Sequence, residues 1–229
     1  MRNILYMAAT MLLCSSCFHV NTNWSGGKNA IKGEGPVVSK SFDELQGFEA
    51  IRINGHADVH FTQSSVYEVT VRTQENILDW LDYKVEGNTL VIETKEKREI
   101  RAEKYDLVIQ APALKKLVVN GASDFNVGNL RSDGDLDIEI NGAGDLDFDS
   151  ILCNSLTLEV NGAADANLTS ISVLKDLKVE VNGAGDVTVT GNAQDASFSV
   201  NGAGDIDATG LQVTGEVSKH ASGLATIKL

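Results

Sequence analysis

The stretch LDIEINGAGDLDF, residues 136–148, decides the fold of this chain. Apolar side chains occupy every second position on both sides of its central pentapeptide, with Leu136, Ile138 and Ile140 before it and Leu146 and Phe148 after it. The positions between them are acidic. An alternation with a period of two residues is typical of a β-strand with one buried face. The stretch therefore predicts a strand, a glycine-rich corner and a second strand.

The pentapeptide at the centre of this stretch recurs along the chain. It is NGASD at Asn120, NGAGD at Asn141, NGAAD at Asn161, NGAGD at Asn182 and NGAGD at Asn201, with spacings of 21, 20, 21 and 19 residues. An upstream copy, NGHAD, begins at Asn54, and a degenerate copy, SGLAT, begins at Ser222. The apolar alternation accompanies each copy. A repeat of this length indicates one structural unit stacked on copies of itself.

Units of about 20 residues suit a parallel β-helix, in which each strand lies about 4.8 Å from its equivalent one turn away. A leucine-rich repeat has a similar length, but its leucine and asparagine spacing is absent here. No segment of the repeat region has the 3.6-residue period of a helix. We therefore predict an all-β parallel β-helix. Leu158 and Val179 share one inward column and are expected to be fully buried.

The residue types of the corner have a physical reason. Glycine at the first and third positions after the asparagine tolerates positive φ and close approach of neighbouring coils. The small alanine between them is expected to point inward at the bend. The asparagines are predicted to be structural turn residues whose side-chain amides pair from coil to coil as a ladder. These residues are Asn120, Asn141, Asn161, Asn182 and Asn201.

The N-terminus carries the features of a targeting segment. Residues 1–16 form a predicted signal peptide, because Arg2 precedes an apolar run from Ile4 to Leu13 that is too short to span a bilayer. Small residues directly before Cys17 resemble a bacterial lipoprotein cleavage site, so Cys17 is the predicted lipidation site. An ordinary secretory signal with an unrelated cysteine is the alternative. Cys153 would then be the only other mature cysteine and is expected to be a small packed residue.

Behind the signal peptide, we expect a lipidated tether over residues 17–36 and a single β-helix domain over residues 37–229. The domain divides into irregular N-terminal coils, residues 37–112, and regular NGAGD repeats, residues 113–229. The 66 residues from Asn54 to Asn120 equal about three periods, so two elaborated coils could fit between them.

Local signals subdivide the irregular part. A short helix is expected over residues 75–81, and Gly87-Asn88 predicts a hairpin between two strands. The charged run KEKREIRAEK, residues 95–104, predicts a solvated loop. Both tryptophans and three of the four tyrosines also lie in the N-terminal part, where we expect them to pack over the open end of the solenoid; an exposed cluster that binds glycan or protein is the alternative. They are Trp24, Trp80, Tyr67, Tyr83 and Tyr105.

The negative charge of the chain limits the classes of partner that it can bind. The formal net charge is −13, and from residue 111 onward 7 basic residues stand against 17 acidic ones. An acidic repeat region argues against binding to nucleic acid and to anionic membrane surfaces. Solubility alone is a sufficient alternative explanation of this charge.

A column of aspartates follows the asparagines at a distance of four residues. Stacked coils would place these carboxylates about 4.8 Å apart along one edge. Each aspartate could cap its own turn by accepting backbone N–H bonds, or the row could bind Ca²⁺, which prefers oxygen ligands. The candidate metal ligands are Asp124, Asp145, Asp165, Asp186 and Asp205. No other cofactor is indicated.

Enzymatic signals are sparse. Parallel β-helices host polysaccharide lyases and hydrolases that use clustered carboxylates, but the acids here are periodic, as repetition alone produces. His56 and His60 flank the first corner, where a surface role is expected rather than a metal pair. No catalytic residue is assigned. The alternative function is a carbohydrate-active enzyme, a polysaccharide lyase or hydrolase, on a β-helix scaffold.

Several of these residues resemble a known bacterial family, described as "putative auto-transporter adhesin, head GIN domain". The resemblance spans roughly residues 35–229. It rests on the following residues: Gly-Glu-Gly at 33–35, Phe48 to Ile51, Gly55, Leu90 to Ile92, Pro112 and the NGAGD corners through Asn201. It implies a right-handed β-helix and an envelope lipoprotein or secreted protein, and it implies no catalytic residues.

Together these features predict a non-enzymatic cell-envelope lipoprotein whose β-helix is an adhesin-like interaction module. Its partner would be an envelope protein or a glycan. At the C-terminal end, Lys219 and Ala221 occupy inward positions that are apolar in earlier copies, while Ile227 and Leu229 remain apolar. We therefore expect this end to dock a second copy of the chain or another partner.

Overall fold

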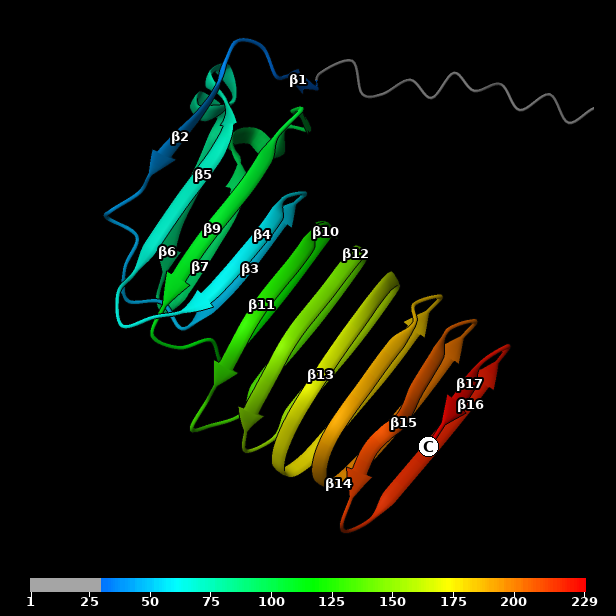
Figure 1. Ribbon diagram of the computed structural model, residues 1–229. Coiled ribbons are helices and arrows are strands. Elements are labelled where there is room, and N and C mark those ends of the chain that lie inside the picture. The colour runs from blue at the N-terminus through cyan, green and yellow to red at the C-terminus, as the bar shows by residue number, and fades with distance from the viewer. Residues whose placement is uncertain (1–29) are drawn as a thin grey trace, which may run out of the picture.

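The computed structural model describes residues 30–229, so the signal peptide, Cys17 and most of the predicted tether lie outside the described residues. The described chain forms a parallel β-helix, as the sequence predicts (Figure 1). No helix within residues 30–229 is long and apolar enough to cross a membrane. The two short helical segments are both 3₁₀ turns, η1 (Glu75–Trp80) and η2 (Lys95–Lys97).

The regular coils run from the middle of the chain to its end, and each lies parallel to the next. Register is kept by residue type, since Leu136 pairs with Leu156 and Asn141 with Asn161. The strands are β10 (Lys116–Ala122), β11 (Asp124–Arg131), β12 (Leu136–Cys153), β13 (Leu156–Gly183), β14 (Val187–Gly202), β15 (Asp205–Val213), β16 (Val217–Gly223) and β17 (Thr226–Lys228). The apolar columns therefore stack on themselves along the axis.

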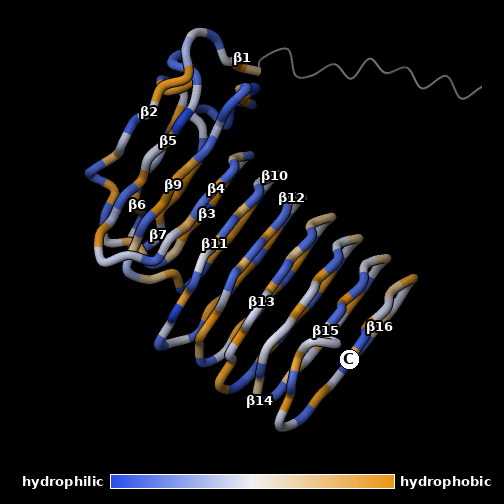
Figure 2. Tube along the Cα trace, in the orientation of Figure 1, coloured by the Kyte–Doolittle hydropathy of each residue, from blue (hydrophilic) through white to orange (hydrophobic). Residues whose placement is uncertain are grey.

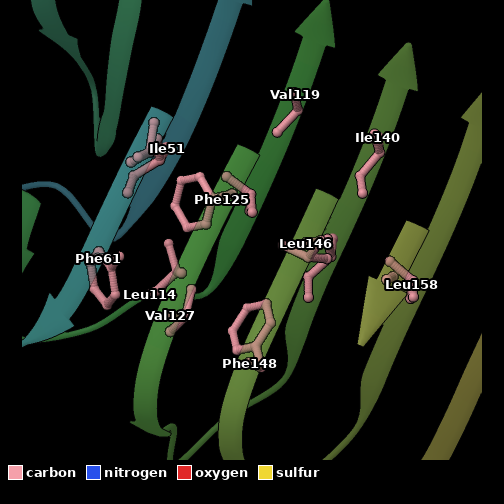
Figure 3. Packing of buried hydrophobic residues seen from close by; sticks show 14 of the residues in the cluster. Ile51, Phe61, Leu114, Val119, Phe125, Val127, Ile140, Leu146, Phe148 and Leu158 are labelled. Carbon is pink, nitrogen blue, oxygen red and sulfur yellow. The ribbon is translucent and has the colours of Figure 1, made fainter. Parts of the chain in front are cut away.

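The core follows the predicted alternation. Leu158 and Val179 are both completely buried, which confirms the inward register. Figure 2 shows hydrophilic and hydrophobic residues alternating along the regular strands. In Figure 3, Phe125, Leu146 and Phe148 pack with the other apolar side chains of the core. Cys153 is also buried and unpaired, and burial raises the pKa of its thiol to about 11.

The corner departs from the prediction at its alanine. The alanines two residues after each asparagine are exposed, and the following residue faces inward, as Ser123 and Ala164 show. The alternation simply continues through the corner, so even-numbered positions after the asparagine face outward. The inward prediction for alanine was wrong because it treated the bend as a break in this period. The exposed residues are Ala122, Ala143, Ala163, Ala184 and Ala203.

An N-terminal cap closes one end of the solenoid. In it, β2 pairs antiparallel with β5, and β5 pairs antiparallel with β9. A second antiparallel pair is formed by β6 and β7. The predicted hairpin at Gly87-Asn88 joins β6 to β7, and the expected short helix is η1. The elements are β1 (Ile31–Lys32), β2 (Val37–Ser41), β3 (Ala50–Gly55), β4 (Asp58–Gln63), β5 (Glu68–Gln74), β6 (Leu81–Glu86), β7 (Thr89–Thr94), β8 (Ile100–Arg101) and β9 (Tyr105–Ala111).

The order of coils in space differs from their order in the chain. The β3–β4 coil lies between the β7–β9 coil on one side and the β10–β11 coil on the other (Figure 1). Asn54 therefore pairs directly with Asn120, 66 residues later. The expectation of two coils between these residues is wrong, because the intervening chain folds back to the outer side and supplies one coil plus the antiparallel cap.

Candidate functional site

The corner asparagines form a continuous ladder of hydrogen bonds. Each side-chain amide donates to the side-chain oxygen of the preceding coil, from Asn201 back to Asn54, over 2.9–3.0 Å. Ser222 continues the column at the C-terminal end, where its hydroxyl donates to Asn201 at 3.0 Å. The bonds all point in one direction and tie six successive coils and the degenerate seventh together.

Glutamates satisfy the second N–H of several ladder amides. Asn141 donates to Glu139 at 2.7 Å and Asn161 to Glu159 at 2.9 Å, in each case two residues earlier in the same coil. At the N-terminal end, Asn54 instead donates to Glu93 of β7 at 3.0 Å. The outward glutamate column is thus a structural partner of the ladder.

Glu93 closes the ladder as an ion pair. Its carboxylate accepts a hydrogen bond from Lys84 at 2.9 Å as well as the bond from Asn54. The Lys84 ammonium first, and the Asn54 amide second, hold the pKa of Glu93 below its ordinary value. The ionised carboxylate of Glu93 therefore accepts the last hydrogen bond of the asparagine ladder, which Asn54 donates.

The aspartate column lies beside the ladder and is also engaged in backbone bonding. The Asp124 carboxylate accepts the backbone N–H of Asp145 at 3.0 Å, and Asp205 accepts that of Thr226 at 2.9 Å. Asp165 and Asp186 act in the same way. The capping alternative had expected each aspartate to accept bonds from its own turn. The structure shows that these carboxylates accept a backbone N–H of the next coil instead.

The same column shows little capacity for a cation. Within residues 30–229, no group of three or more His, Cys, Asp or Glu side chains is placed to hold a metal ion. The pKa of Asp145 is raised, mainly because its carboxylate loses hydration and secondly because the negative charges of Asp124 and Asp165 repel it. One oxygen of most of these carboxylates is already committed to a backbone N–H. The geometry thus adds nothing to the calcium hypothesis.

A pocket of about 570 Å³ lies at the first corner, and it exists because one corner is expanded. In the β3–β4 coil, three residues separate Asn54 from Asp58. In the neighbouring β7–β9 coil, Glu93 and Asp106 hold the equivalent positions, but twelve residues separate them. The longer connection stands away from Gly55, which has open space where every later corner glycine contacts its neighbour. We call this space the corner pocket.

The outer wall of the corner pocket is the charged run of residues 95–104. The run forms η2 and then β8, which pairs with β1, so it is ordered rather than a wholly solvated loop. Glu96 and Lys97 both adopt positive φ, 54° and 52°, a conformation that costs about 1–3 kcal/mol for each non-glycine residue. Bonds from Thr94 to the carbonyl of Arg98 at 2.7 Å and from Lys95 to Asp79 at 2.6 Å brace the wall.

The walls of the corner pocket combine an apolar floor with a charged rim. Ile53 and Ile92 form part of the floor, together with backbone of Gly55 and Gly121. Tyr105 lies at one side, where it donates or accepts a 2.7 Å bond with the Tyr83 hydroxyl and contacts His56 edge-on. Burial raises the pKa of Tyr105 to about 12, so its hydroxyl stays protonated. No pattern in the sequence marked this pocket, because it depends on which strands become neighbours.

The aromatic residues of the cap are packed. Tyr83 stacks on Phe42 with ring centroids 5.0 Å apart, and Tyr67 stacks on Phe48 at 5.1 Å. Arg98 lies over the ring of Trp80. This agrees with the expectation that the aromatics cover the end of the solenoid. Trp24 and the predicted lipidation site Cys17 lie outside the described residues.

Within residues 30–229, no element covers the last coil in the way that the cap covers the first. Every residue of β16 is exposed, and among the described strands it pairs only with β14. Lys219 lies opposite Phe198 and Ala221 opposite Val200, in the register expected from the sequence. Val217, Leu224 and Leu229 are exposed as well. One edge of the last coil therefore presents unpaired backbone groups and apolar side chains to solvent.

A family model matches most of the chain. The model is described as "Putative auto-transporter adhesin, head GIN domain", and it matches residues 47–173 and 170–229. The match covers the chain from β3 to β17, and β1 and β2 of the cap precede it. A search of curated proteins gives no match.

Solved structures share the fold. A protein of Parabacteroides distasonis titled a putative lipid binding protein aligns with a TM-score of 0.77 at 21% identity, covering 87% of this chain and 96% of the other. A putative adhesin of the same organism aligns at 0.74 and 24% identity, covering 87% and 84%. A putative adhesin of Bacteroides fragilis aligns at 0.70 and 22% identity, covering 86% and 99%. At these identities the likeness concerns the fold.

Proposed function

The chain belongs to the family described as putative auto-transporter adhesins with a head GIN domain, and from this premise we propose that it is a non-enzymatic interaction module of the cell envelope. Its uncapped C-terminal coil is the observation that carries the proposal. The solenoid is rigid and covered at its N-terminal end, so the open coil is its exposed adhesive edge. The adhesin names of the family and of two structural neighbours support this assignment.

The proposal includes a lipid anchor at Cys17. The apolar run before this cysteine and the small residues next to it support acylation there. Cys17→Ser should release the protein from the membrane fraction of cells. Cys153→Ser is the matched control, because that thiol is buried in the solenoid. A Cys17→Ser variant that stays with membranes in high salt contradicts the anchor.

A second copy of the chain is the proposed occupant of the open end. The acidic columns end toward the last coil. The glutamate column already ends at Ser199, which pairs with His220, and Thr226 and Lys228 replace Asp205 and Asp207. Two ends can therefore approach without the repulsion that the acidic coils would cause. Antiparallel pairing of β16 about His220 would set Lys219 opposite Ala221 of the second copy, so that no two lysines face each other.

Sedimentation velocity tests this association with the soluble domain. Wild type should dimerise in a concentration-dependent manner, deletion of residues 226–229 should weaken the dimer, and Lys219→Leu should strengthen it by removing a charge from the edge. Lys175→Leu, an exposed position in a regular coil, should behave as wild type. A monomer for wild type and for all variants would reject self-association through this end.

The electrostatics of the corner pocket support a non-enzymatic role over a glycosidase. A glycoside hydrolase needs a general acid whose pKa is raised. Glu93, one of the two carboxylates that line the pocket, has its pKa lowered by Lys84 and Asn54 instead. Acids of the regular coils, such as Asp124 and Glu159, recur with the repeat and are bonded within it. A polysaccharide-cleavage assay that detected activity lost on Glu93→Gln would favour the enzyme alternative.

A further inference from the structure

We propose that the corner pocket is a binding site for an amphiphile that has a single apolar chain and an anionic head group. The inference goes beyond the proposed interaction role, because it concerns the opposite end of the molecule. It stands on the shape of the pocket, on its apolar floor and on the balance of charge at its rim.

The shape follows from the missing corner. In each regular coil, the corner backbone of the preceding coil fills the space beside the glycine, so an added Cβ at Gly121 would overlap Gly55 and one at Gly142 would overlap Gly121. At Gly55 the expanded connection of residues 94–105 leaves that space open instead, with a volume of about 570 Å³. Ligand pockets typically span about 300–1,000 Å³. The pocket is thus built into the topology and is large enough for a chain molecule.

The floor suits an apolar chain. Ile53, Ile92 and Ile100 contribute to it, and all three belong to the continuous hydrophobic core. Ala122 lies at its edge and is exposed, like the equivalent alanines of later corners. The isoleucines themselves are only 1–3% exposed, so a chain bound over them would cover mainly the exposed carbon surface of the corners at Gly55 and Ala122 and would remove it from water.

The rim suits an anionic head group. Its acids are neutralised by neighbours, since Glu93 pairs with Lys84 at 2.9 Å and Glu99 with Arg101 at 2.9 Å. Lys97 also lines the pocket, and within residues 30–229 its ammonium has no hydrogen-bond or ion-pair partner. The positive charge of Lys97 also helps to lower the pKa of Glu93. In a chain with a net charge of −13, this is a local site of positive charge that a carboxylate or phosphate head would complement.

The bracing of the wall gives the site a fixed form. Lys97 is held with positive φ between the bonds of Thr94 and Lys95, so its ammonium is presented from a defined backbone. A preorganised site loses less conformational freedom when it binds.

Fluorescence titration with dansylundecanoic acid tests the site on the soluble domain. Wild type should bind the probe saturably, and Ala122→Trp, which fills the pocket, should weaken binding at least tenfold. Ala184→Trp is the matched control, because it places the same side chain at the same corner position three coils away. Equal binding by wild type and Ala122→Trp, or no saturable binding by wild type, would overturn the proposal.

Charge is tested by Lys97→Glu, with Lys175→Glu as the control that makes the same change outside the pocket. Lys97→Glu should weaken the anionic probe about tenfold, and Lys175→Glu should leave it unchanged. Myristate should displace the probe from wild type, or lysophosphatidylglycerol, which has one acyl chain, should do so if the source is a membrane lipid. Tetradecanol that competes as well as myristate would contradict the anionic head group. Circular dichroism of each variant separates lost binding from lost folding.

Discussion

At the scale of single residues, the ladder amides have a common direction. Every asparagine donates toward the N-terminal end, so the bond dipoles add along the axis and strengthen one another. The donor end of this row meets the anionic Glu93, and the acceptor end meets the Ser222 hydroxyl. Both ends of the row are therefore satisfied by the protein itself.

Removing one member of the row should be costly. Asn161→Ala deletes bonds to Asn141, Glu159 and Asn182 together. With a net value of about 0.5–1.5 kcal/mol for each of the three bonds, we expect a loss of about 1.5–4.5 kcal/mol in the free energy of unfolding. Urea denaturation measures it. Asn126→Ala, which lies outside the ladder and makes no such bond, should change the midpoint little; equal shifts for the two variants would contradict the role of the ladder.

The Glu93 ion pair should make stability depend on pH. The pKa of Glu93 in the folded protein lies below the ordinary value of 4.5, so its charge stabilises the fold above that pH, and this contribution disappears as the pH falls through the folded pKa. Glu93→Gln should be less stable than wild type at neutral pH and should lose less Tm between about pH 5 and about pH 3. Glu216→Gln, at the exposed C-terminal coil, should keep the wild-type slope. Parallel Tm curves for Glu93→Gln and wild type would be the contrary result.

At the scale of elements, the corner glycine decides how closely two coils can stack. Gly162 has a φ of 154°, and a Cβ there would overlap the backbone of Gly142 in the coil before. The residue is thus required both by its own conformation and by the neighbour's approach. Strand and corner depend on each other, because the ladder bonds of Asn161 form only when the glycine beside it lets the coils meet.

Gly162→Ala should therefore destabilise the solenoid strongly. We expect a loss of about 2–4 kcal/mol, since the strain and the overlap both act on one residue. Gly128→Ala is the control, because that position has open space around it and no positive φ. Thermal unfolding followed by circular dichroism compares the two, and a Gly162→Ala variant as stable as Gly128→Ala would exclude the steric argument.

Elements also mark the boundary of what the sequence can predict. The strands of the regular coils, the inward columns and the asparagine ladder follow from a period of two inside a period of about 20, as Leu158 and Asn161 illustrate. The direction of the corner alanines was missed because a bend suggests a break in alternation that does not occur. The pairing of Asn54 with Asn120 was missed because it depends on long-range topology, which leaves no local periodicity.

The corner pocket was missed for the same topological reason. Its wall is visible in the sequence only as a charged run, and its floor comes from corners that are distant in the chain. What marks it in retrospect is the interval between Glu93 and Asp106, twelve residues where the repeat has three. That interval has meaning only after β7 and β9 are known to form a coil.

At the scale of the whole molecule, stability should fall from the cap toward the C-terminus. Each coil contacts only its neighbours, and the last coil has a neighbour on one side. Native-state hydrogen exchange should therefore be fastest in β16, which is paired on one side, and slower in β12, β13 and β14, where both sides are paired. Protection that is uniform from β12 to β16 would indicate a single cooperative unit. Dimerisation at high concentration should slow exchange in β16 specifically.

The equivalence of consecutive coils makes the length of the molecule a quantity that changes in fixed steps. Duplication of one unit of about 20 residues would add one strand spacing of about 4.8 Å to the axis. The new coil would meet the same asparagine, glycine and apolar columns on both faces, and neither the cap nor the terminal coil would acquire a new kind of neighbour. A tandem duplication alone can therefore lengthen the solenoid by one coil, while the residues at each end stay the same.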